Sequence, residues 1–314
     1  MFDVSIVIVS WNTRELVRQC LASLPQGCGR LTREILVVDN ASSDGTPEMV
    51  QTEFPDVVLI RNQANLGFAK ANNLGVRSAR GKYVCLINSD VNVPAGCIEK
   101  MFDYMEGEDA VGLLGPKMLS GEGVPSPSCM QRPTLFITFI NALGLSGLFQ
   151  RAGLHMKNFH RVTSQDVDVL NGWFWMARRR ALDNVGLLDE QFFMYGEDID
   201  WCDRFWGAGW RVVYFPQAAA IHYGAASSAR APIRFYIEMH RANLQYWKRH
   251  HGALSQAAYL SIVILHHVCR VLGYGAVYAL YPPRRSDVSI KISRSAACLR
   301  WLFGAPLEQQ PAVA

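Results

Sequence analysis

The sequence lacks the glycine-rich motifs with which many nucleotide-binding folds hold phosphate groups. No G-x-G-x-x-G follows its first apolar run, and no G-x-x-x-x-G-K-[ST] occurs anywhere in its 314 residues. These absences exclude the dinucleotide fingerprint and the P-loop, in which backbone N–H groups surround the phosphates. If the chain binds a phosphorylated ligand, a cation must therefore neutralise the phosphate charge.

The sequence also has no paired cysteines and no strong charge of one sign. Its eight cysteines lie singly, without a C-x-x-C pair or a histidine spacing typical of zinc, which predicts reduced thiols. The formal charge is only +4, with no arginine-rich arm or aromatic RNA-binding motif, so we expect no nucleic-acid partner. The N-terminus has no basic n-region, and its apolar run Val4–Val9 is too short for a secretory signal. We therefore expect a cytoplasmic location.

The first hundred residues alternate short apolar runs with helical patterns. Four runs are rich in β-branched residues and lack clean alternation, which is typical of parallel strands covered on both faces. After the first run, Asn12 and Glu15 resemble a capping box that would begin a helix with an apolar stripe from Leu16 to Leu24. The pattern predicts an α/β fold with a βαβ series. The runs are Val4–Val9, Glu34–Val38, Val57–Ile60 and Tyr83–Ile87.

Polar or turn residues follow each predicted strand. Because the carboxyl ends of parallel strands meet at one edge of a sheet, these residues would line one ligand-binding crevice. The segments are Ser10–Asn12, Asp39–Gly45, Arg61–Asn62 and Asn88–Asp90.

A second acidic segment, with Glu197, Asp198 and Asp200, begins a predicted helix. An isolated acidic run is usually a solvated helix face. Together with Asp90 at the sheet edge, it predicts a site for a metal-bound diphosphate beside a carboxylate base. The aromatic residues of this helix recur at helical spacing, which is more typical of core than of a sugar platform. They are Trp201, Phe205 and Trp206.

Several segments match one enzyme family in order and spacing. They are Val7–Asn12, Val37–Gly45, Asn65–Ala69, Asn72, Gly75, Asn88–Asp90, Gly196–Asp198 and His222. From about residue 4 to about residue 250, the chain resembles a family 2 glycosyltransferase. This resemblance implies a GT-A fold, with a Rossmann-like, mostly parallel central sheet and helices on both faces. Within the family, the chain is most similar to the rhamnosyltransferase-like branch of cell-surface polysaccharide assembly.

The resemblance implies positions for the nucleotide. In this family, the position of Asp39 accepts a hydrogen bond from the base, which suits the imide N–H of uracil or thymine. Asn65, Gly67 and Asn72 match the segment that flanks the nucleotide and ribose. A helix cap with a packing glycine would use the same residues. The resemblance further implies that Ser10, Asn12, Asn88 and Glu197 bind substrate.

The resemblance also implies a metal site, at Asp90 and His222. The ion would be Mn²⁺ or Mg²⁺, and an imidazole ligand accords better with Mn²⁺. Asn88 stands where the common DxD form has its first aspartate, so we expect weak metal binding without substrate. The alternative for His222 is a structural histidine.

Asp198 is the candidate general base, and the resemblance implies that the transfer is inverting. Asp39 and the resemblance together predict transfer of a hexose from a pyrimidine nucleotide sugar, with dTDP-L-rhamnose preferred over UDP-hexoses, to a lipid-linked saccharide. Two alternatives are a nucleotidyltransferase and a non-catalytic nucleotide-sugar-binding protein. The first usually has a glycine-rich arginine loop, which is missing here, and the second has no need of Glu197 and Asp198. A processive synthase would have several clear membrane spans.

The predicted organisation is a glycosyltransferase domain over residues 1–252 and a helical tail over 253–314. Within the domain, residues 1–115 form the nucleotide-sugar half and 116–252 the acceptor half. The alternation fails between Pro116 and Asp168, which indicates an acceptor-facing insertion. A buried strand is expected over Asn171–Ala177. Its Trp173 and Trp175 would be buried, or would stack on a sugar.

In the tail, Ala257–Tyr281 is almost wholly apolar and long enough to span a membrane. Arg270 near its centre would cost about 2.5–3.5 kcal/mol there, so a helix lying in the membrane interface fits better. Its apolar face would insert while His266 and Arg270 face the headgroups. The alternatives are a homodimer interface or a core-covering helical pair. We expect a peripheral protein on the inner face of the cell membrane, with basic residues from Arg284 to Arg300 near anionic lipids.

Overall fold

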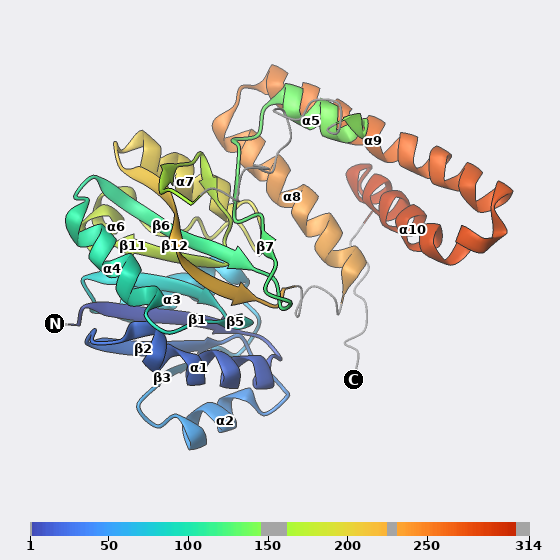
Figure 1. Cartoon of the computed structure of the whole chain (residues 1–314). Coiled ribbons are helices and arrows are strands. Elements are labelled where there is room, and N and C mark those ends of the chain that lie inside the picture. Colours follow the sequence, from blue (N-terminus) through green and yellow to red (C-terminus); the bar gives the residue numbers. More distant parts are fainter. Residues whose placement is uncertain (1, 146–161, 225–230, 306–314) are drawn as a thin grey trace. The chain divides into compact units, whose positions relative to one another are not determined.

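The computed structural model describes residues 2–145, 162–224 and 231–305 (Figure 1). The chain forms two compact units, residues 1–132 with 155–227 and residues 133–154 with 228–314. The second unit therefore includes an internal segment and a helix before residue 252, whereas the predicted division began the helical part at residue 253.

The first unit contains a mixed ten-stranded sheet with the order β3-β2-β1-β4-β11-β6-β12-β5 along its main path. Strands β3, β2, β1 and β4 are parallel, and β11 is inserted antiparallel between β4 and β6. The predicted α/β class and the four predicted strands are confirmed. The main strands are β1 (Val4–Ser10), β2 (Arg33–Asp39), β3 (Val58–Arg61), β4 (Tyr83–Asn88), β5 (Val91–Asn92), β6 (Val111–Leu119), β11 (Phe174–Arg178) and β12 (Arg211–His222).

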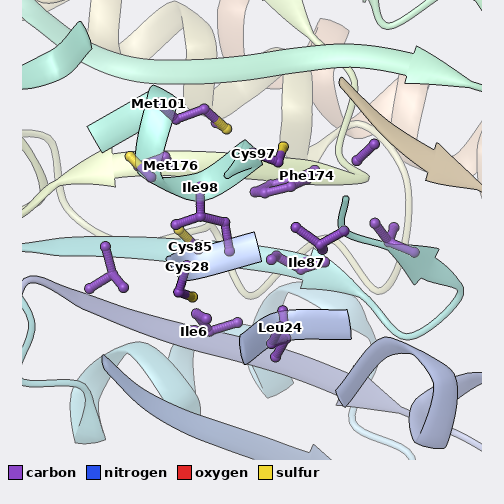
Figure 2. Close-up of a cluster of buried hydrophobic side chains, with 14 of the residues drawn as sticks. Ile6, Leu24, Cys28, Cys85, Ile87, Cys97, Ile98, Met101, Phe174 and Met176 are labelled. Carbon is purple, nitrogen blue, oxygen red and sulfur yellow. The ribbon is translucent and has the colours of Figure 1, made fainter. Parts of the chain in front are cut away.

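Helices cover both faces of this sheet, as the runs without alternation predicted. Ile6 lies on the face where α1 (Arg14–Cys28) and α4 (Cys97–Gly107) bury a large apolar cluster, shown in Figure 2. The neighbouring Val7 points to α3 (Phe68–Ser78) on the other face. There, a Cβ added at Gly75 would lie 2.3 Å from Val7 Cγ1, so the glycine lets helix and strand approach closely.

The predicted capping box at Asn12 and Glu15 is wrong. Helix α1 begins at Arg14, and its N-cap residue makes no side-chain hydrogen bond to it. Instead, Asp44 in the loop after β2 accepts a 2.9 Å hydrogen bond from the Arg14 N–H. Asn12 Oδ1 accepts from the Ser43 N–H at 2.7 Å. The loop after β2 therefore supplies the hydrogen-bond acceptor at the start of α1, in place of a side chain from the N-cap residue.

The region after β6 is irregular in its described part, as predicted. It contains β7 (Pro125–Ser126), β8 (Cys129–Met130), β9 (Gln165–Asp166) and β10 (Val169–Leu170). Residues 146–161 of the predicted insertion lie outside the described residues. The strand predicted over Asn171–Ala177 is β11, in which Trp175 is fully buried and donates a hydrogen bond to Leu170 O. The remaining helices of this unit are α2 (Thr46–Glu53), α6 (Arg179–Val185) and α7 (Glu197–Gly207).

The second unit is helical. Its elements are α5 (Leu135–Ala142), α8 (Pro232–His250), α9 (Ala253–Leu280), the short η3 (Pro282–Arg284) and α10 (Arg285–Leu302). Helix α9 contacts α5, α8 and α10. It is long and apolar enough to cross a membrane, and few of its residues are buried within the chain.

The polar side of α9 faces its neighbouring helices. His266 Nδ1 donates a 2.8 Å hydrogen bond to Ala142 O in α5, and Arg270 Nε donates to Ser295 Oγ in α10 at 3.3 Å. Leu265 and Leu272 are exposed on the opposite side. The expectation that His266 and Arg270 face outward is therefore wrong, because the packed helices offer these groups hydrogen-bond acceptors.

Candidate active site

The carboxyl ends of β1, β2, β3 and β4 meet at one edge of the sheet. Ser10 and Asp39, the last residues of β1 and β2, are partners in the parallel register. Asp39 in turn pairs with Arg61 of β3, and Val9 pairs with Asn88 of β4. The polar segments singled out in the sequence are thus brought together at this edge.

Asp39 is buried and has one oxygen that protein groups do not satisfy. Its Oδ2 accepts a 2.9 Å hydrogen bond from the Ser42 N–H, whereas Oδ1 has no hydrogen-bond partner among the described residues. A buried acceptor left unpaired typically costs about 1–3 kcal/mol, and more when charged. A ligand N–H donor at this oxygen would remove that cost.

Asp90 and His222 lie together although they are far apart in the sequence. His222 Nε2 is 3.1 Å from Asp90 Oδ1, because antiparallel pairing of β5 with β12 places His222 opposite Val91. The imidazole ring stacks on Trp173 with centroids 5.5 Å apart, and its Nδ1 contacts Met118 Sδ at 3.3 Å. The ring is therefore held with Nε2 toward the carboxylate.

Buried hydroxyl groups connect the end of β1 to the Asn88–Asp90 segment. Ser10 Oγ lies 3.1 Å from Thr13 Oγ1, and Thr13 Oγ1 donates to Ser89 Oγ at 3.0 Å. Neither Thr13 nor the stacking of Trp173 on His222 could be identified from the sequence. Their contacts depend on the pairing of distant segments, which no local pattern reveals.

The first turn of α7 presents three carboxylates in different environments. Asp200 is fully buried and bonded to Arg204 Nε at 2.9 Å, so it is a structural ion pair. Glu197 is buried with Oε2 unpaired among the described residues, and burial together with Asp198 raises its pKa well above the usual value. Asp198 is half-buried and accepts from the Ile199 N–H, while burial raises its pKa to about 6. Asp198 is therefore the carboxylate best suited to exchange a proton near neutral pH.

The aromatic residues of α7 belong to the core, as predicted. Trp201 and Phe205 are buried, and their ring centroids are 5.2 Å apart. Trp206 Nε1 donates a hydrogen bond to Val167 O.

The Asn65–Asn72 segment supports the loop that leads into α7. Asn65 Oδ1 accepts from the Gly67 N–H at 3.0 Å, and Asn72 Nδ2 donates to Phe68 O at 3.0 Å. Gly67 has a φ of 82°, and a Cβ there would lie 2.4 Å from Phe193 O. The close approach at Gly67 is thus to protein backbone.

The described chain has three non-glycine residues with positive φ, and all lie in loops near these groups. They are Asn12 at 55°, Ala41 at 60° and Tyr195 at 69°. Asn12 follows β1, Ala41 follows β2, and Tyr195 precedes α7. Such conformations are uncommon and tend to cluster at functional sites, so their placement supports this edge as the active site.

A cavity of about 550 Å³ lies beside the start of β4, at the other end of the strands. Arg80 and Lys82 line it, but they are paired with Glu34 and Glu106. The charges of these two residues are already neutralised, and none of the site residues predicted from the sequence lines this cavity.

The sheet has the architecture of the GT-A fold. Of the solved structures, a mannosyltransferase from Pyrobaculum calidifontis, in complex with GDP-Man and Mn²⁺, matches with a TM-score of 0.56 and 18% sequence identity. The match covers 97% of this chain and 88% of that one. A structure of GalNAc-T7 with UDP, GalNAc and Mn²⁺ matches 79% of this chain and 50% of its own, with a TM-score of 0.53 and 12% identity.

The chain belongs to glycosyl transferase family 2, whose family model matches residues 5–186. It is similar to the N-acetylglucosaminyl-diphospho-decaprenol L-rhamnosyltransferase of Mycobacterium tuberculosis, with 31% identity over 251 residues. That alignment covers 76% of this chain and 81% of the relative. A low-salt glycan biosynthesis hexosyltransferase, Agl10 of Haloferax volcanii, is 25% identical over 64% of this chain and 61% of its own. The prediction of a family 2 glycosyltransferase of the rhamnosyltransferase-like branch is therefore confirmed.

Proposed function

We propose that this glycosyltransferase is metal-dependent and inverting, and that it transfers L-rhamnose from dTDP-rhamnose to a lipid-linked saccharide. The observation that carries the proposal is the placement of the Asp90–His222 pair at the sheet edge where Asp39 keeps an unpaired buried oxygen. These groups suit a cation-bound diphosphate and a nucleotide base. The name of the mycobacterial relative supports the sugar and the lipid-linked acceptor.

Asp90 and His222 fit a divalent cation. Neighbouring ligands of an octahedral ion with bonds of about 2.1 Å lie about 3 Å apart, and the two donor atoms are separated by 3.1 Å. When bound, the ion would neutralise the diphosphate and stabilise it as the leaving group. The imidazole favours Mn²⁺ over Mg²⁺. Asn88 is neutral, so Asp90 is the sole carboxylate of its segment. The free protein should therefore bind the ion weakly, and the ion should bind together with the nucleotide diphosphate.

Asp198 would accept the proton of the acceptor hydroxyl while the oxygen attacks the anomeric carbon from the face opposite the diphosphate. The new glycosidic bond forms as the bond to the diphosphate breaks, which inverts the anomeric centre. Burial, together with the neighbouring Asp198, raises the pKa of Glu197 well above its usual value, so Glu197 would be protonated and donate a hydrogen bond to substrate. These roles of Asp198 and Glu197, together with the family membership, favour a glycosyltransferase over a nucleotidyltransferase or a nucleotide-sugar-binding protein without activity.

The donor preference tests the proposal directly. We expect turnover with dTDP-rhamnose to exceed that with UDP-hexoses in a panel of nucleotide sugars assayed for nucleotide release. Asp39→Asn should weaken binding of dTDP by about 10- to 100-fold, because a charged hydrogen bond is worth about 1.5–3 kcal/mol. With the amide oxygen toward the Ser42 N–H, the amide nitrogen would face the imide N–H of the base. Asp56→Asn, at an exposed aspartate, is the matched control.

Efficient turnover of GDP-mannose, with none of thymidine or uridine donors, would contradict both the base and the sugar. An unchanged dTDP affinity in Asp39→Asn would contradict only the assignment of Asp39.

We further propose that α9 lies in the membrane interface, on the inner face of the cell membrane. Its polar side bonds to α5 and α10, which leaves an apolar side free to insert. The basic residues after it would add about 1 kcal/mol each near an anionic surface. These residues include Arg284, Arg285, Lys291, Arg294 and Arg300.

Substitution of the exposed apolar side should weaken membrane binding. We expect wild-type protein to bind anionic vesicles in a salt-sensitive manner, and Leu265→Gln with Leu272→Gln to lower the affinity at least 10-fold, since a buried leucine contributes about 1.5–3 kcal/mol. Val124→Gln, at an exposed valine of the first unit, should bind as wild type. Vesicle sedimentation measures all three. If wild-type protein does not bind vesicles and the double variant changes from dimer to monomer, the exposed apolar side of α9 is a homodimer interface.

A further inference from the structure

Three side chains with metal-binding atoms meet in the helical unit, which contains none of the residues assigned above to the transfer reaction. His240 lies on α8, His267 on α9 and Cys298 on α10. One nitrogen of each imidazole and the Cys298 Sγ lie within 4.8 Å of one another. His267 and Cys298 are fully buried, and His240 is only 8% exposed.

The two imidazoles have no hydrogen-bond partners. Neither ring nitrogen of His240 or of His267 is paired with any group in the described part of the chain. Their rings meet at an interplanar angle of 77°, with centroids 4.7 Å apart. Each unpaired buried polar group costs about 1–3 kcal/mol. A single cation that accepts both nitrogen lone pairs would remove much of this cost.

We propose that His240, His267 and Cys298 bind a zinc ion that joins α8, α9 and α10. Two imidazoles and one thiolate form a borderline-soft ligand set, which suits Zn²⁺ and does not suit Mg²⁺ or Ca²⁺. Since each helix contributes one ligand, the ion stabilises the packing of all three. This site differs in ligand chemistry from the Asp90–His222 pair, which offers a carboxylate and an imidazole but no thiolate.

Local charge and spacing set two requirements for the site. Arg270 bonds to Ser295 Oγ one turn before Cys298, and its guanidinium disfavours a nearby dication. The thiol must therefore bind as the thiolate, whose negative charge offsets this repulsion. Ligands of tetrahedral zinc lie about 3.3–3.6 Å apart, as bonds of about 2.0–2.3 Å require, so the side chains need to converge by roughly 1 Å.

A cavity of about 180 Å³ reaches one of the three proposed ligands, His240. It lies among α5, α8 and α9, and it is lined by His240 together with residues that include Asn243, Tyr259 and His266. The three protein ligands leave one position of a tetrahedral ion open. In zinc sites with three protein ligands, a water molecule commonly occupies this position.

Metal analysis of the full-length protein tests the site. The protein is purified with a tag that contains no histidine, without chelators, and its zinc is measured by inductively coupled plasma mass spectrometry. We expect about one zinc per chain, and loss of at least 80% of it in Cys298→Ser and in His267→Ala. Cys269→Ser is the matched control, because Cys269 is an exposed cysteine of α9. It should retain its zinc.

A second measurement keeps the test decisive if the variants misfold. Co²⁺ added to metal-stripped wild-type protein should give near-ultraviolet thiolate-to-cobalt charge-transfer absorption, which the Asp90–His222 pair cannot produce because neither of its ligands is a thiolate. The absorption should persist in Asp90→Ala. The proposal is overturned if wild-type protein contains only background zinc and shows no such absorption. It is also overturned if Cys298→Ser and His267→Ala fold and keep their full zinc content.

Discussion

Replacing Asp198 by asparagine should lower turnover at least 100-fold while the affinities for nucleotide and divalent metal remain within about threefold of wild type. General-base assistance is typically worth about 10²- to 10⁴-fold in rate. The substitution preserves shape and keeps an oxygen to accept the Ile199 N–H bond, but it removes basicity. Steady-state kinetics with a soluble acceptor, together with calorimetry of nucleotide binding, separates the two effects. Asp183→Asn, at an exposed aspartate of α6, is the control.

The pH dependence gives the same assignment an independent test. Burial raises the pKa of Asp198 to about 6, and the base acts only when deprotonated. Turnover of the wild type should therefore rise with pH through about 6, and this limb should be missing from the residual activity of Asp198→Asn. Near-normal turnover in Asp198→Asn would show that another residue is the general base. Glu197 would be tested next, since Asp200 is bonded to Arg204.

Asp90→Ala should abolish turnover and weaken donor binding together. The substitution removes the carboxylate from the pair with His222, whose Nε2 now lies 3.1 Å from Asp90 Oδ1. We expect at least a 1,000-fold loss of turnover, because a metal contributes several kcal/mol of charge stabilisation, and about 1.4 kcal/mol is a factor of ten. Asp56→Ala provides a control at an exposed position.

Calorimetry distinguishes the role of the metal from that of the carboxylate alone. Wild-type protein should bind Mn²⁺ weakly by itself and at least 10-fold more tightly with nucleoside diphosphate present, since Asn88 leaves Asp90 as the sole carboxylate of its segment. Asp90→Ala should lose this enhancement. Equal Mn²⁺ affinity with and without nucleotide would contradict the proposed site, as would full turnover in the presence of a chelator.

The parallel half of the sheet could be predicted because its signals are local. Runs such as Val4–Val9 and Tyr83–Ile87 specify buried strands, and the carboxyl-edge rule then brings Asp39 and Asp90 together. The pairing of Asp90 with His222 required the family resemblance, since their contact depends on β5 and β12, which are distant in sequence. The 3.1 Å distance between His222 Nε2 and Asp90 Oδ1 could not be predicted from the sequence.

Other features could not be predicted because tertiary contacts determine them. Asn12 has the residue type of a cap, but Asp44 from another loop takes the first N–H group of α1. The orientation of α9 depends on the acceptors that α5 and α10 present to His266 and Arg270. A periodic apolar pattern identifies the helix and its faces, but it does not say which face meets protein and which meets membrane.

The contact between Gly67 and Phe193 affects how mutational scans of this enzyme should be interpreted. The Phe68 N–H donates to Phe193 O, so the segment matched to the donor nucleotide also anchors the stretch that leads into α7 and Asp198. A side chain at position 67 would clash with Phe193 O and thereby displace the segment that carries the general base, Asp198. Loss of activity there would imitate a defect in donor recognition, and only a separate binding measurement would reveal a misaligned catalyst.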